Sequence, residues 1–459
     1  MESKNGRVIE LERENQKLKE RIKQLTDDFE YLQKVYENDM NQINFERFAR
    51  LNYQYIKNHG ILKFLWQVLR SLWKIVLVVK RKIMRVIKRI KHRKELKHIL
   101  RNYKGKKIFL FYPGYDWNMR MYQRPQHMAT HLAEKGILFF YCTTNINDNI
   151  DGFEEVKEGL FVTDQYDYLK KHLPKYTLYM CANMNGCYLR ELKKILSGNN
   201  DVLYEFIDDL HEDLTSISDE LLERHKFVLK NKDIKVVTTA QYLYDKAVKL
   251  RGSNKNIIIS TNGVVYNDFH ITKKLPVPSN IKDIVKQNKP IIGYYGALAK
   301  WFDYDLIEEM AKKHNDWNIL LIGVDYDKSF AKYNYFKDLD NVYYIGAVDY
   351  KSLINYGNCC SVLTIPFLIN EITKSTSPVK VFEYMSMEKP VVTTDLPECR
   401  KYKSVLISKN HNEFIKNVEK GIAMQSDGKY REVLKNEALA NTWSKKAEEI
   451  LDFINEREK

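Results

Sequence analysis

Residues 106–144 read KKIFLFYPGYDWNMRMYQRPQHMATHLAEKGILFFYCTT, and the order of features in this stretch decides the fold class. An apolar, aromatic run ends at Gly114, and a helix-like stretch follows at 124–135. A second apolar run begins directly after Gly136. A strand, a glycine-containing turn, a helix and a further strand form a βαβ unit, and such units build parallel sheets. The sequence therefore predicts an α/β domain in this part of the chain.

Strand-like and helix-like stretches continue to alternate along the rest of the chain, with one interruption. A polar, proline-containing stretch at 271–289 separates two series and is expected to be a linker. The further strand-like runs lie at 176–182, 201–207, 234–240, 256–264, 289–298, 318–324, 341–348, 361–367 and 390–394. Two successive doubly wound, Rossmann-like domains are therefore expected, the first at 105–270 and the second at 290–430.

The composition agrees with a folded cytoplasmic protein. The chain has 459 residues, of which 44% are hydrophobic and 12% aromatic, so it can build sizeable cores and is not globally disordered. Gly 18 and Pro 10 exclude a collagen-like chain. The six cysteines form no CxxC pair, which argues against a disulfide scaffold and favours a reducing compartment. No apolar segment typical of a secretory signal occurs at the N-terminus.

Most of the net charge lies in one segment. Residues 61–101 hold fourteen Lys and Arg against one acid, Glu95, which accounts for +13 of the formal net charge of +15. Lys63, Arg70 and Lys74 interrupt its apolar part at helical spacing, which disfavours a membrane span and favours a helix lying on an anionic membrane surface. We therefore expect residues 46–104 to form a basic amphipathic segment at the membrane surface. Two alternatives stay open, since the apolar face can pack on the protein body and the basic face can bind nucleic acid.

A heptad pattern precedes this segment, within residues 1–45. Its apolar residues alternate in steps of three and four across 8–36, with leucine at every d position and one polar residue, Asn15, at an a position. This pattern is typical of a parallel two-stranded coiled coil, and it predicts a homodimer through 8–36. The alternative is a single amphipathic helix packed on the body.

The stretch SPVKVFEY (377–384) has the chemistry of an anion-binding helix start. Ser377 is expected as the N-cap and Pro378 as the first helical residue. Free N–H groups and the positive end of the helix dipole attract a diphosphate there, and Lys380 adds a cation in the first turn. Glu383, on the same helix face, can accept hydrogen bonds from ribose hydroxyls. The alternative is an ordinary surface helix.

Open α/β sheets bind ligands outside the carboxyl ends of their strands, which places several residues of the first domain in the expected cleft. Gly114 ends the first strand, and three neighbours that follow it are candidates for acceptor binding. They are Asp116, Trp117 and Arg124. Asp208 and Asp209 end a later strand, where a carboxylate can act as a base toward an acceptor hydroxyl or can simply cap a turn.

These residues resemble a known family, the GT-B glycosyltransferases of the large retaining group (family 4, group 1) that includes bacterial polysaccharide and teichuronic acid enzymes. The resemblance covers roughly 105–455 and rests mainly on Ser377-Pro-Val-Lys-Val-Phe-Glu-Tyr384 followed by Lys389-Pro-Val-Val-Thr393. Further matching pieces are Gln123-Arg-Pro-Gln126, Asp208-Asp209, Asn262-Gly263-Val264, Gly293-Tyr-Tyr-Gly296, Leu321-Ile-Gly323 and Pro366-Phe367.

The resemblance implies a nucleotide diphosphate sugar bound to the second domain, an acceptor bound to the first, and a final segment at 431–459 that packs back on the first domain. The donor-binding residues that it implies are Gly296, Lys300, Gly323, Ser377, Pro378, Lys380 and Glu383. It implies a catalytic or acceptor-orienting role near Asp208 and Asp209. No cofactor beyond the sugar nucleotide is expected.

One departure from the family concerns its paired-glutamate motif. The first glutamate of that motif would fall at position 375, where this chain has Ser375, and Glu371 does not align with it. The group that contacts the donor sugar and the stereochemical outcome of the reaction therefore stay open.

We also expect no metal site. His127 and His131 lack a third ligand, and the pairs Asp303/Asp305 and Asp325/Asp327 only imitate the metal motif of the other glycosyltransferase fold, GT-A.

The sequence thus predicts a glycosyltransferase in cell-surface polysaccharide synthesis, peripheral on the inner face of the plasma membrane, with a lipid-linked or membrane-proximal glycan as acceptor. Two other classes compete with this interpretation. One is a non-catalytic, membrane-tethered coiled-coil scaffold whose GT-B body binds a nucleotide sugar, which the serine at position 375 favours. The other is a protein that binds nucleic acid through 61–104.

Overall fold

The computed structural model describes residues 57, 88, 90–119, 122–184, 187–211, 217–333, 336 and 338–456. The chain divides into two compact units, 1–94 and 95–459, and both β-sheets belong to the second unit. The predicted coiled coil at 8–36 and most of the basic segment at 61–104 lie outside the described residues and stay predictions.

The first lobe is an α/β domain built on an eight-stranded sheet. Its strands run in the order β3-β4-β2-β1-β5-β6-β7-β8, and all neighbouring pairs are parallel except β3 with β4. The strands are β1 (Ile108–Phe111), β2 (Leu138–Cys142), β3 (Phe153–Lys157), β4 (Leu160–Thr163), β5 (Thr177–Cys181), β6 (Asp201–Phe206), β7 (Lys235–Thr238) and β8 (Ile257–Ile259). The β3–β4 hairpin is an element that the sequence analysis did not predict.

Helices connect these strands. They are α4 (Arg124–Glu134), α5 (Tyr166–His172), α6 (Leu189–Ser197), α7 (Asp219–Lys230) and α8 (Gln241–Arg251). The central strands are buried on both faces because helices cover a parallel sheet on both sides, which explains their uninterrupted apolar sequences. The edge strand β3 reads FEEVK and is largely exposed, as expected for an edge that charged side chains protect.

The second lobe is built on a six-stranded, wholly parallel sheet in the order β11-β10-β9-β12-β13-β14. Its strands are β9 (Ile291–Tyr295), β10 (Asn318–Ile322), β11 (Val342–Tyr344), β12 (Val362–Ile365), β13 (Val391–Thr394) and β14 (Val405–Ser408). Its helices are α9 (Tyr266–Phe269), α10 (Lys282–Lys286), α11 (Tyr304–Lys313), α12 (Ser329–Tyr333), α13 (Leu353–Cys359), α14 (Glu371–Lys374), α15 (Val379–Ser386), α16 (His411–Met424) and α17 (Gly428–Ala440).

Each sheet has one point where the order of strands reverses. In the first lobe the chain leaves β1 toward β2 and later returns to β5 on the other side of β1. In the second lobe it leaves β9 toward β10 and returns to β12 beside β9. The loops at the carboxyl ends of such neighbouring strands diverge, so the crevice between them is where ligands bind in open α/β sheets.

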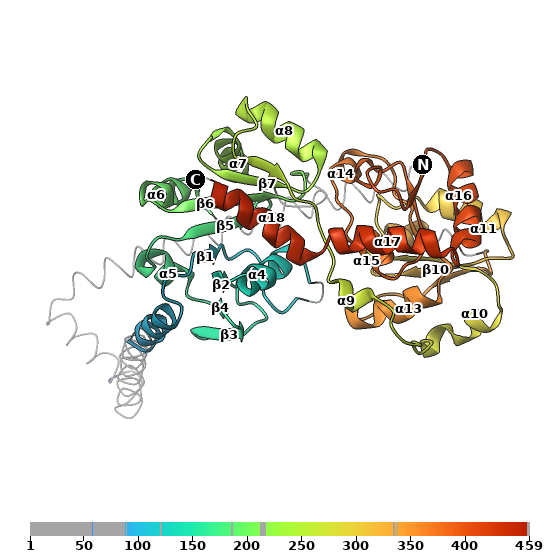
Figure 1. Cartoon of the computed structure of the whole chain (residues 1–459), viewed down its shortest axis with the longest axis horizontal. Coiled ribbons are helices and arrows are strands. Elements are labelled where there is room, and N and C mark those ends of the chain that lie inside the picture. Colours follow the sequence, from blue (N-terminus) through green and yellow to red (C-terminus); the bar gives the residue numbers. More distant parts are fainter. Residues whose placement is uncertain are drawn as a thin grey trace. The chain divides into compact units, whose positions relative to one another are not determined.

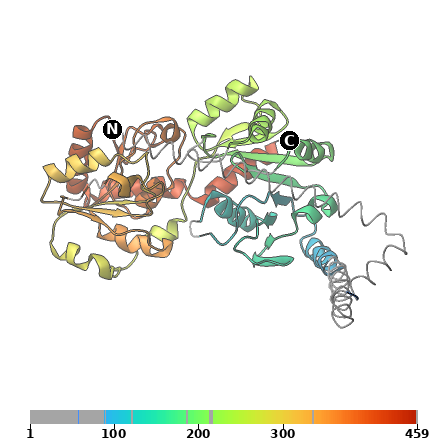
Figure 2. The ribbon, with the colours of Figure 1, turned by 180° about the vertical axis from the view of Figure 1, so that it is seen from behind.

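The last helix of the chain, α18 (Trp443–Asn455), returns to the first lobe, whereas α16 and α17 belong to the second (Figures 1 and 2). It packs on α4, where the Trp443 and His127 rings stack with centroids 4.7 Å apart. At the crossing point, Trp443 N–H donates to the Val264 carbonyl at 3.1 Å. Gly263 is required here, since a methyl group on it would lie 2.8 Å from the Asn441 carbonyl oxygen.

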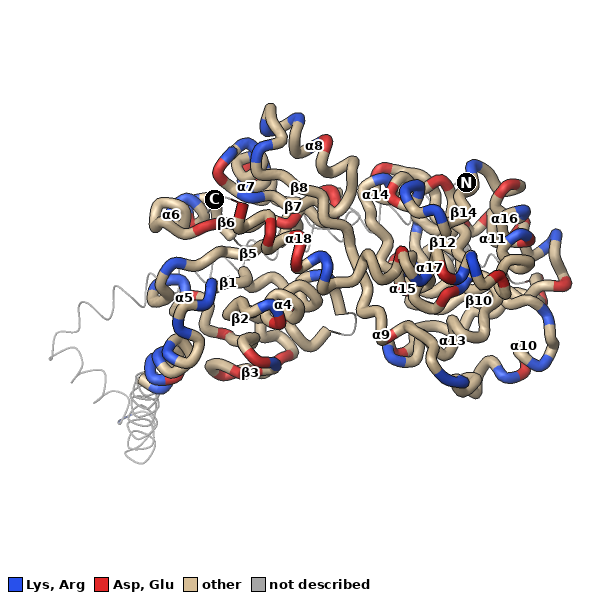
Figure 3. Tube along the Cα trace, in the orientation of Figure 1, with Lys and Arg blue, Asp and Glu red and all other residues tan. Residues whose placement is uncertain are grey.

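The described end of the basic segment is a helix over 90–102, and its Lys and Arg positions are blue in Figure 3. Leu96 and Ile99 are buried in the hydrophobic core of the first lobe. The last turns of this segment are therefore part of the folded body and not only of a surface element. Among the described residues, no helix is both long and apolar enough to cross a bilayer.

Candidate functional site

The start of α15 lies in the loop region at the carboxyl end of β12, next to β9. The helix begins at Val379, one residue later than predicted, and Pro378 occupies the N-cap position. Proline has no side-chain acceptor, and no side chain caps this helix. In its first turn the Val381 N–H donates to the Pro378 carbonyl at 3.2 Å, whereas the N–H groups of Val379 and Lys380 lie before the first intrahelical hydrogen bond. By contrast, side chains cap α7, α11, α16, α17 and α18.

Ser377 does not act as the predicted N-cap. Its hydroxyl oxygen accepts a hydrogen bond from the Asn262 N–H at 3.3 Å, and its carbonyl accepts one from Asn262 Nδ2 at 2.7 Å. Ser377 is therefore tied to the end of the first lobe, and its side chain does not cap α15.

Lys380 lies over this start from the first turn of α15. Its Nζ stands 4.8 Å from the centroid of Phe367 and 5.4 Å from that of Tyr294, and these rings hold it by cation–π contacts. Within the described part of the chain, no hydrogen bond or ion pair engages this ammonium. Burial lowers the pKa of Lys380 to about 8, although the Glu383 carboxylate opposes the shift. The side chain is therefore held in place by aromatic rings, and its ammonium has no hydrogen-bonded partner among the described residues.

Two glycines line the ends of the neighbouring strands β9 and β10. Gly296 has φ +146°, and a methyl group on it would lie 2.9 Å from Lys380 Nζ. Gly323 has φ +145°, and a methyl group on it would lie 1.8 Å from the Gly296 carbonyl oxygen. Both positions therefore require glycine, because the backbone conformation and the contacts leave no room for a side chain. Gly323 thus makes room for the Gly296 backbone and Gly296 for the Lys380 side chain, and we call these two glycines the glycine floor.

Glu383 lies on the second turn of α15 and is 8% exposed. Burial raises its pKa to about 7, while Tyr295 and Lys380 pull it down and Asp268 pushes it further up. The Tyr350 hydroxyl donates to Asp268 Oδ2 at 3.2 Å beside it. The site thus holds a carboxyl that is poised between its two protonation states near neutral pH.

Lys300 lies in the exposed loop after β9. Its backbone N–H donates to Asp327 Oδ2 at 2.9 Å, which fastens this loop to the loop after β10. The two loops border the glycine floor.

Asp303 and Asp325, one from each pair that imitates a metal motif, have structural partners. Asp303 caps α11 through the Leu306 N–H at 3.0 Å, and Asp325 accepts the Ala331 N–H at 2.9 Å. Among the described residues no group of three His, Cys, Asp or Glu side chains is placed to hold a metal ion.

Ser375, at the position of the family's first glutamate, is fully buried and donates to the Ile372 carbonyl at 2.8 Å. Glu371 is exposed on α14 and accepts from the Tyr242 hydroxyl at 2.9 Å. Neither residue supplies a carboxylate to the crevice at the start of α15.

In the first lobe, the Asp116 carboxylate accepts several hydrogen bonds from the loop after β2. It accepts hydrogen bonds from the Thr143 hydroxyl at 2.9 Å and the Asn147 N–H at 2.7 Å, and it also contacts the Thr144 hydroxyl. Burial alone would raise its pKa, but these donors outweigh burial and lower it to about 2. The carboxylate therefore holds the loops after β1 and β2 together.

Two further candidates of the first lobe also pack internally. A methyl group on Gly114 would lie 2.6 Å from Met184 Cγ, so this glycine makes room for a protein side chain. The Trp117 ring packs edge-on against Tyr122 and Tyr141, at 5.5 and 5.1 Å.

Arg124 opens α4 and is 4% exposed. Its Nε and Nη2 donate to Glu205 Oε1 at 3.0 and 2.9 Å, forming an ion pair with a fully buried residue of β6. The sequence analysis missed Glu205, although a charged residue in the apolar run DVLYEFI is a visible signal that a buried cation faces it.

Asp208 and Asp209, at the carboxyl end of β6, differ in their partners. Both oxygens of Asp209 accept from Lys246 Nζ at 2.7 Å. No hydrogen bond reaches the half-buried Asp208 from the part of the chain that the structure describes. Burial and then the neighbouring Asp209 raise the pKa of Asp208 to about 6. Of the two, Asp208 is the better candidate for a general base, because Lys246 already binds Asp209 and the pKa of Asp208 is raised toward neutral pH.

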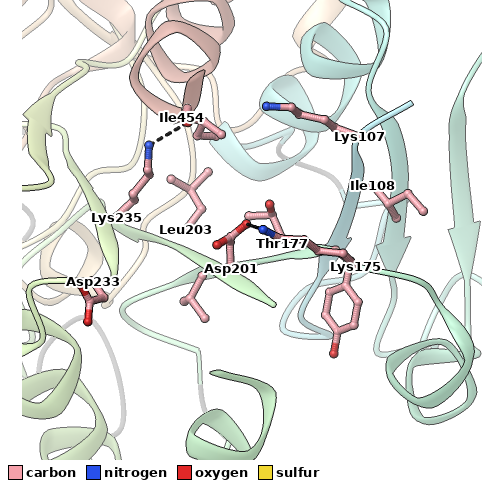
Figure 4. A pocket seen from close by; sticks show the side chains of 11 residues that line it. Lys107, Ile108, Lys175, Thr177, Asp201, Leu203, Asp233, Lys235 and Ile454 are labelled. Atoms are coloured by element: carbon pink, nitrogen blue, oxygen red, sulfur yellow. Dashed lines mark hydrogen bonds and ion pairs between the residues drawn. The ribbon is translucent and has the colours of Figure 1, made fainter. Parts of the chain in front are cut away.

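A cavity of about 450 Å³ lies at the opposite, amino-terminal edge of the first sheet (Figure 4). Lys235 Nζ donates there to the Ile454 carbonyl at 2.8 Å, and Lys107 Nζ donates to Asn455 Oδ1 at 2.7 Å. These lysines hold the C-terminal end of α18, where cations are favourable. The cavity lies where the end of α18 contacts the first sheet, and the start of α15 does not line it.

Comparison with known proteins agrees with this geometry. The family model "Glycosyl transferases group 1" matches residues 289–423, which contain the glycine floor and the start of α15. Residues 289–423 therefore form a group 1 glycosyltransferase domain, and the two lobes have the GT-B fold. The chain is 24% identical over 267 residues to the putative teichuronic acid biosynthesis glycosyltransferase TuaH of Bacillus subtilis (strain 168). The match covers 55% of this chain and 66% of TuaH, so it spans just under two thirds of that relative's length.

Solved structures share the fold of this chain at low sequence identity. Sucrose-phosphate synthase from Thermosynechococcus elongatus superposes with a TM-score of 0.53 at 14% identity, over 76% of this chain and 98% of the synthase. HepE of Anabaena, solved in complex with UDP-glucose, superposes with a TM-score of 0.52 at 12% identity, over 76% of this chain and 99% of HepE. Two lobes of this architecture confirm the GT-B part of the predicted fold class, and the coiled coil and the amphipathic helix stay predictions.

Proposed function

We propose that the protein transfers a sugar from a nucleotide diphosphate sugar to a hydroxyl group of a glycan. The observation that carries this proposal is the uncapped start of α15, over which two aromatic rings hold the ammonium of Lys380. A diphosphate matches this arrangement, since it can accept from the free N–H groups and pair with the lysine. HepE, which has the same fold, was solved with UDP-glucose.

The residues around this start have complementary roles in the proposal. Gly296 and Gly323 let the phosphates approach the backbone closely, and Glu383 accepts hydrogen bonds from the ribose hydroxyls. Ser377 and Pro378 set the entry of the helix, and Lys300 adds a cation at the rim. The donor thus occupies the domain at 290–430.

The acceptor binds the domain at 105–270 in this proposal. The bond between the sugar's anomeric carbon and the phosphate oxygen breaks, and a bond to the acceptor oxygen forms. Asp208 takes the proton of the acceptor hydroxyl, and the nucleoside diphosphate leaves. Gly114, Asp116, Trp117 and Arg124 shape the loops of this domain on which the acceptor rests.

We further propose that the acceptor is a lipid-linked or membrane-proximal glycan in cell-surface polysaccharide synthesis. Two observations support this, the similarity to a protein named for teichuronic acid biosynthesis and the charge of +13 in residues 61–101. A basic segment brings a peripheral enzyme to the anionic inner leaflet of the plasma membrane. A homodimer through 8–36 would double the attachment.

A second candidate function is a non-catalytic scaffold that binds a nucleotide sugar. The buried serine at position 375 favours it, because the family's first glutamate is missing from the crevice. The scaffold and the enzyme bind the same donor but differ in turnover.

The test is a panel of UDP-, GDP- and dTDP-sugars with the purified full chain. We expect one nucleotide class to raise the melting temperature, and we expect release of the free nucleoside diphosphate when a glycan acceptor is added. Binding without any release supports the scaffold. Absence of stabilisation by every sugar nucleotide contradicts the proposal.

A further inference from the structure

A continuous series of hydrogen bonds joins the buried ion pair of the first lobe to the residue that precedes Pro378. Arg124 Nη1 donates to the Thr261 carbonyl at 2.8 Å and to Asn262 Oδ1 at 3.4 Å. Asn262 in turn donates to Ser377 twice, once through its backbone N–H and once through its side-chain amide. The series therefore runs from Glu205 through Arg124 and Asn262 to Ser377.

The chemistry of the partners fixes the orientation of the Asn262 amide. A guanidinium has only donors, so the Asn262 atom that faces Arg124 must be the oxygen. Nδ2 then points the other way, where the Ser377 carbonyl accepts from it. Glu205 binds Nε and Nη2 of Arg124, so the guanidinium cannot rotate without breaking the ion pair.

The residues of this hydrogen-bonded series are buried, so few other groups can replace their hydrogen-bond partners. Arg124 and Ser377 are each 4% exposed and Asn262 is 9% exposed, so water does not readily replace the bonds. The next residue, Pro378, has no N–H and a fixed φ, and no side chain caps α15. The direction in which the chain enters α15 therefore depends on the hydrogen bonds between Asn262 and Ser377.

We infer that Asn262 is a positioning residue that sets the first turn of α15 for the donor diphosphate, with the Arg124–Glu205 ion pair as its fixed support. This inference rests on the proposed function for the identity of the ligand. It gives Arg124 a role through other residues, in place of direct contact with an acceptor.

Two other hydrogen bonds between the lobes provide a matched control. The Tyr242 hydroxyl donates to Glu371 and the Gln241 N–H donates to Glu398 Oε1 at 2.7 Å, and both involve α8 and not α15. Tyr242→Phe removes one hydroxyl and one bond between the lobes. It separates a specific effect on α15 from a general loosening of the lobes.

The test variant is Asn262→Asp, which keeps the shape and the oxygen that faces Arg124. Its carboxylate cannot donate to the Ser377 carbonyl. We expect the KM for the sugar nucleotide to rise about tenfold with kcat within about threefold of the wild type, the size expected for one lost hydrogen bond. Tyr242→Phe should leave both constants within about twofold. Unchanged KM in folded Asn262→Asp overturns the inference.

Hydrogen exchange supplies a readout that needs no donor. In Asn262→Asp, and in Asn262→Ala if the first variant does not fold, the amides of Val379, Lys380 and Val381 should exchange at least fivefold faster than in the wild type. Those amides should exchange as in the wild type in Tyr242→Phe. Equal exchange in all variants overturns the inference. A wild type that binds no sugar nucleotide contradicts the proposed function instead, and the exchange rates still decide whether Asn262 orders the helix start.

Discussion

The charged residues at the carboxyl ends of the two sheets differ in whether other protein groups already bind them by hydrogen bonds or ion pairs. In the first lobe, Asp116 is enclosed by donors, Arg124 is paired with Glu205, and Asp209 is paired with Lys246. In the second lobe, aromatic faces hold the ammonium of Lys380, and α15 has no capping side chain. Asp208 is the candidate of the first lobe whose carboxylate receives no hydrogen bond from the described residues.

We therefore distinguish polar residues that stabilise the fold from polar residues that bind a ligand in the proposed function. A polar side chain whose bonding capacity is filled internally contributes to stability, and its removal is felt in the free energy of unfolding. A polar side chain that is preplaced but not bonded costs stability and contributes only when a ligand arrives. Substitution of an internally bonded residue should therefore lower the free energy of unfolding, whereas substitution of a residue without such bonds should lower activity.

The largest expected effect is on Lys380→Met. This change removes the ammonium over the start of α15 but keeps an unbranched apolar side chain against Tyr294 and Phe367. We expect kcat/KM for the sugar nucleotide to fall about a thousandfold, since a charge-assisted contact to a diphosphate in a partly buried site is lost. Steady-state kinetics check this. Lys416→Met, an exposed lysine on α16, is the control and should behave as the wild type.

Glu383→Gln should stabilise the free protein at high pH while weakening donor binding. The folded-state pKa of about 7 exceeds the ordinary 4.5, so the wild type loses stability as pH rises through this interval. The glutamine variant does not titrate and should gain about 3 kcal/mol over the wild type at pH 8 and nothing at pH 4. Urea unfolding at both pH values measures the difference. Equal stability differences at the two pH values would show that the buried carboxyl is not responsible.

Asp208→Asn should lower kcat about a hundredfold, in the range for loss of a general base, whereas Asp209→Asn should change kcat by less than about fivefold. The reason is that Lys246 already binds Asp209. In the wild type, kcat should rise with pH through about 6, because the base acts only when Asp208 is ionised. A pH profile of each variant checks this. A larger loss in Asp209→Asn than in Asp208→Asn would reverse the assignment.

The smallest expected effect is on Asp116→Asn, in the enclosed loop of the first lobe. The lowered pKa of about 2 means that the carboxylate stabilises the fold above pH 3.8 and that this contribution is lost as pH falls toward 2. We expect a loss of about 2 kcal/mol at pH 7, with sugar-nucleotide affinity unchanged. Denaturant unfolding and calorimetric binding measure the two quantities. A loss of affinity without a loss of stability would make this residue part of the binding site.

The sequence supports the fold class better than it supports the individual sites. Apolar runs that end in glycine predict buried parallel strands because strand and helix periodicities are local properties. The start of α15 is predicted to within one residue for the same reason, from Ser377, Pro378 and the helix formers that follow.

Hydrogen-bond and ion-pair partners that lie far apart in the sequence cannot be predicted from such local patterns. Arg124 looks like an exposed acceptor contact until Glu205, 81 residues away, is seen to bind it. Ser377 looks like a cap until Asn262, 115 residues away, takes its hydroxyl and carbonyl. Long-range pairing therefore decides which polar residues remain available, and this pairing follows only from the assembled fold.

The most direct test of the central claim is calorimetric titration of UDP, GDP and dTDP into the wild type and Lys380→Met at pH 7 and pH 9. We predict that one of the three binds the wild type at pH 7 and binds it up to about tenfold more weakly at pH 9, because the lysine with a pKa of about 8 loses its charge. Lys380→Met should bind weakly at both pH values. Equal affinity of the variant and the wild type at pH 7 would contradict the account.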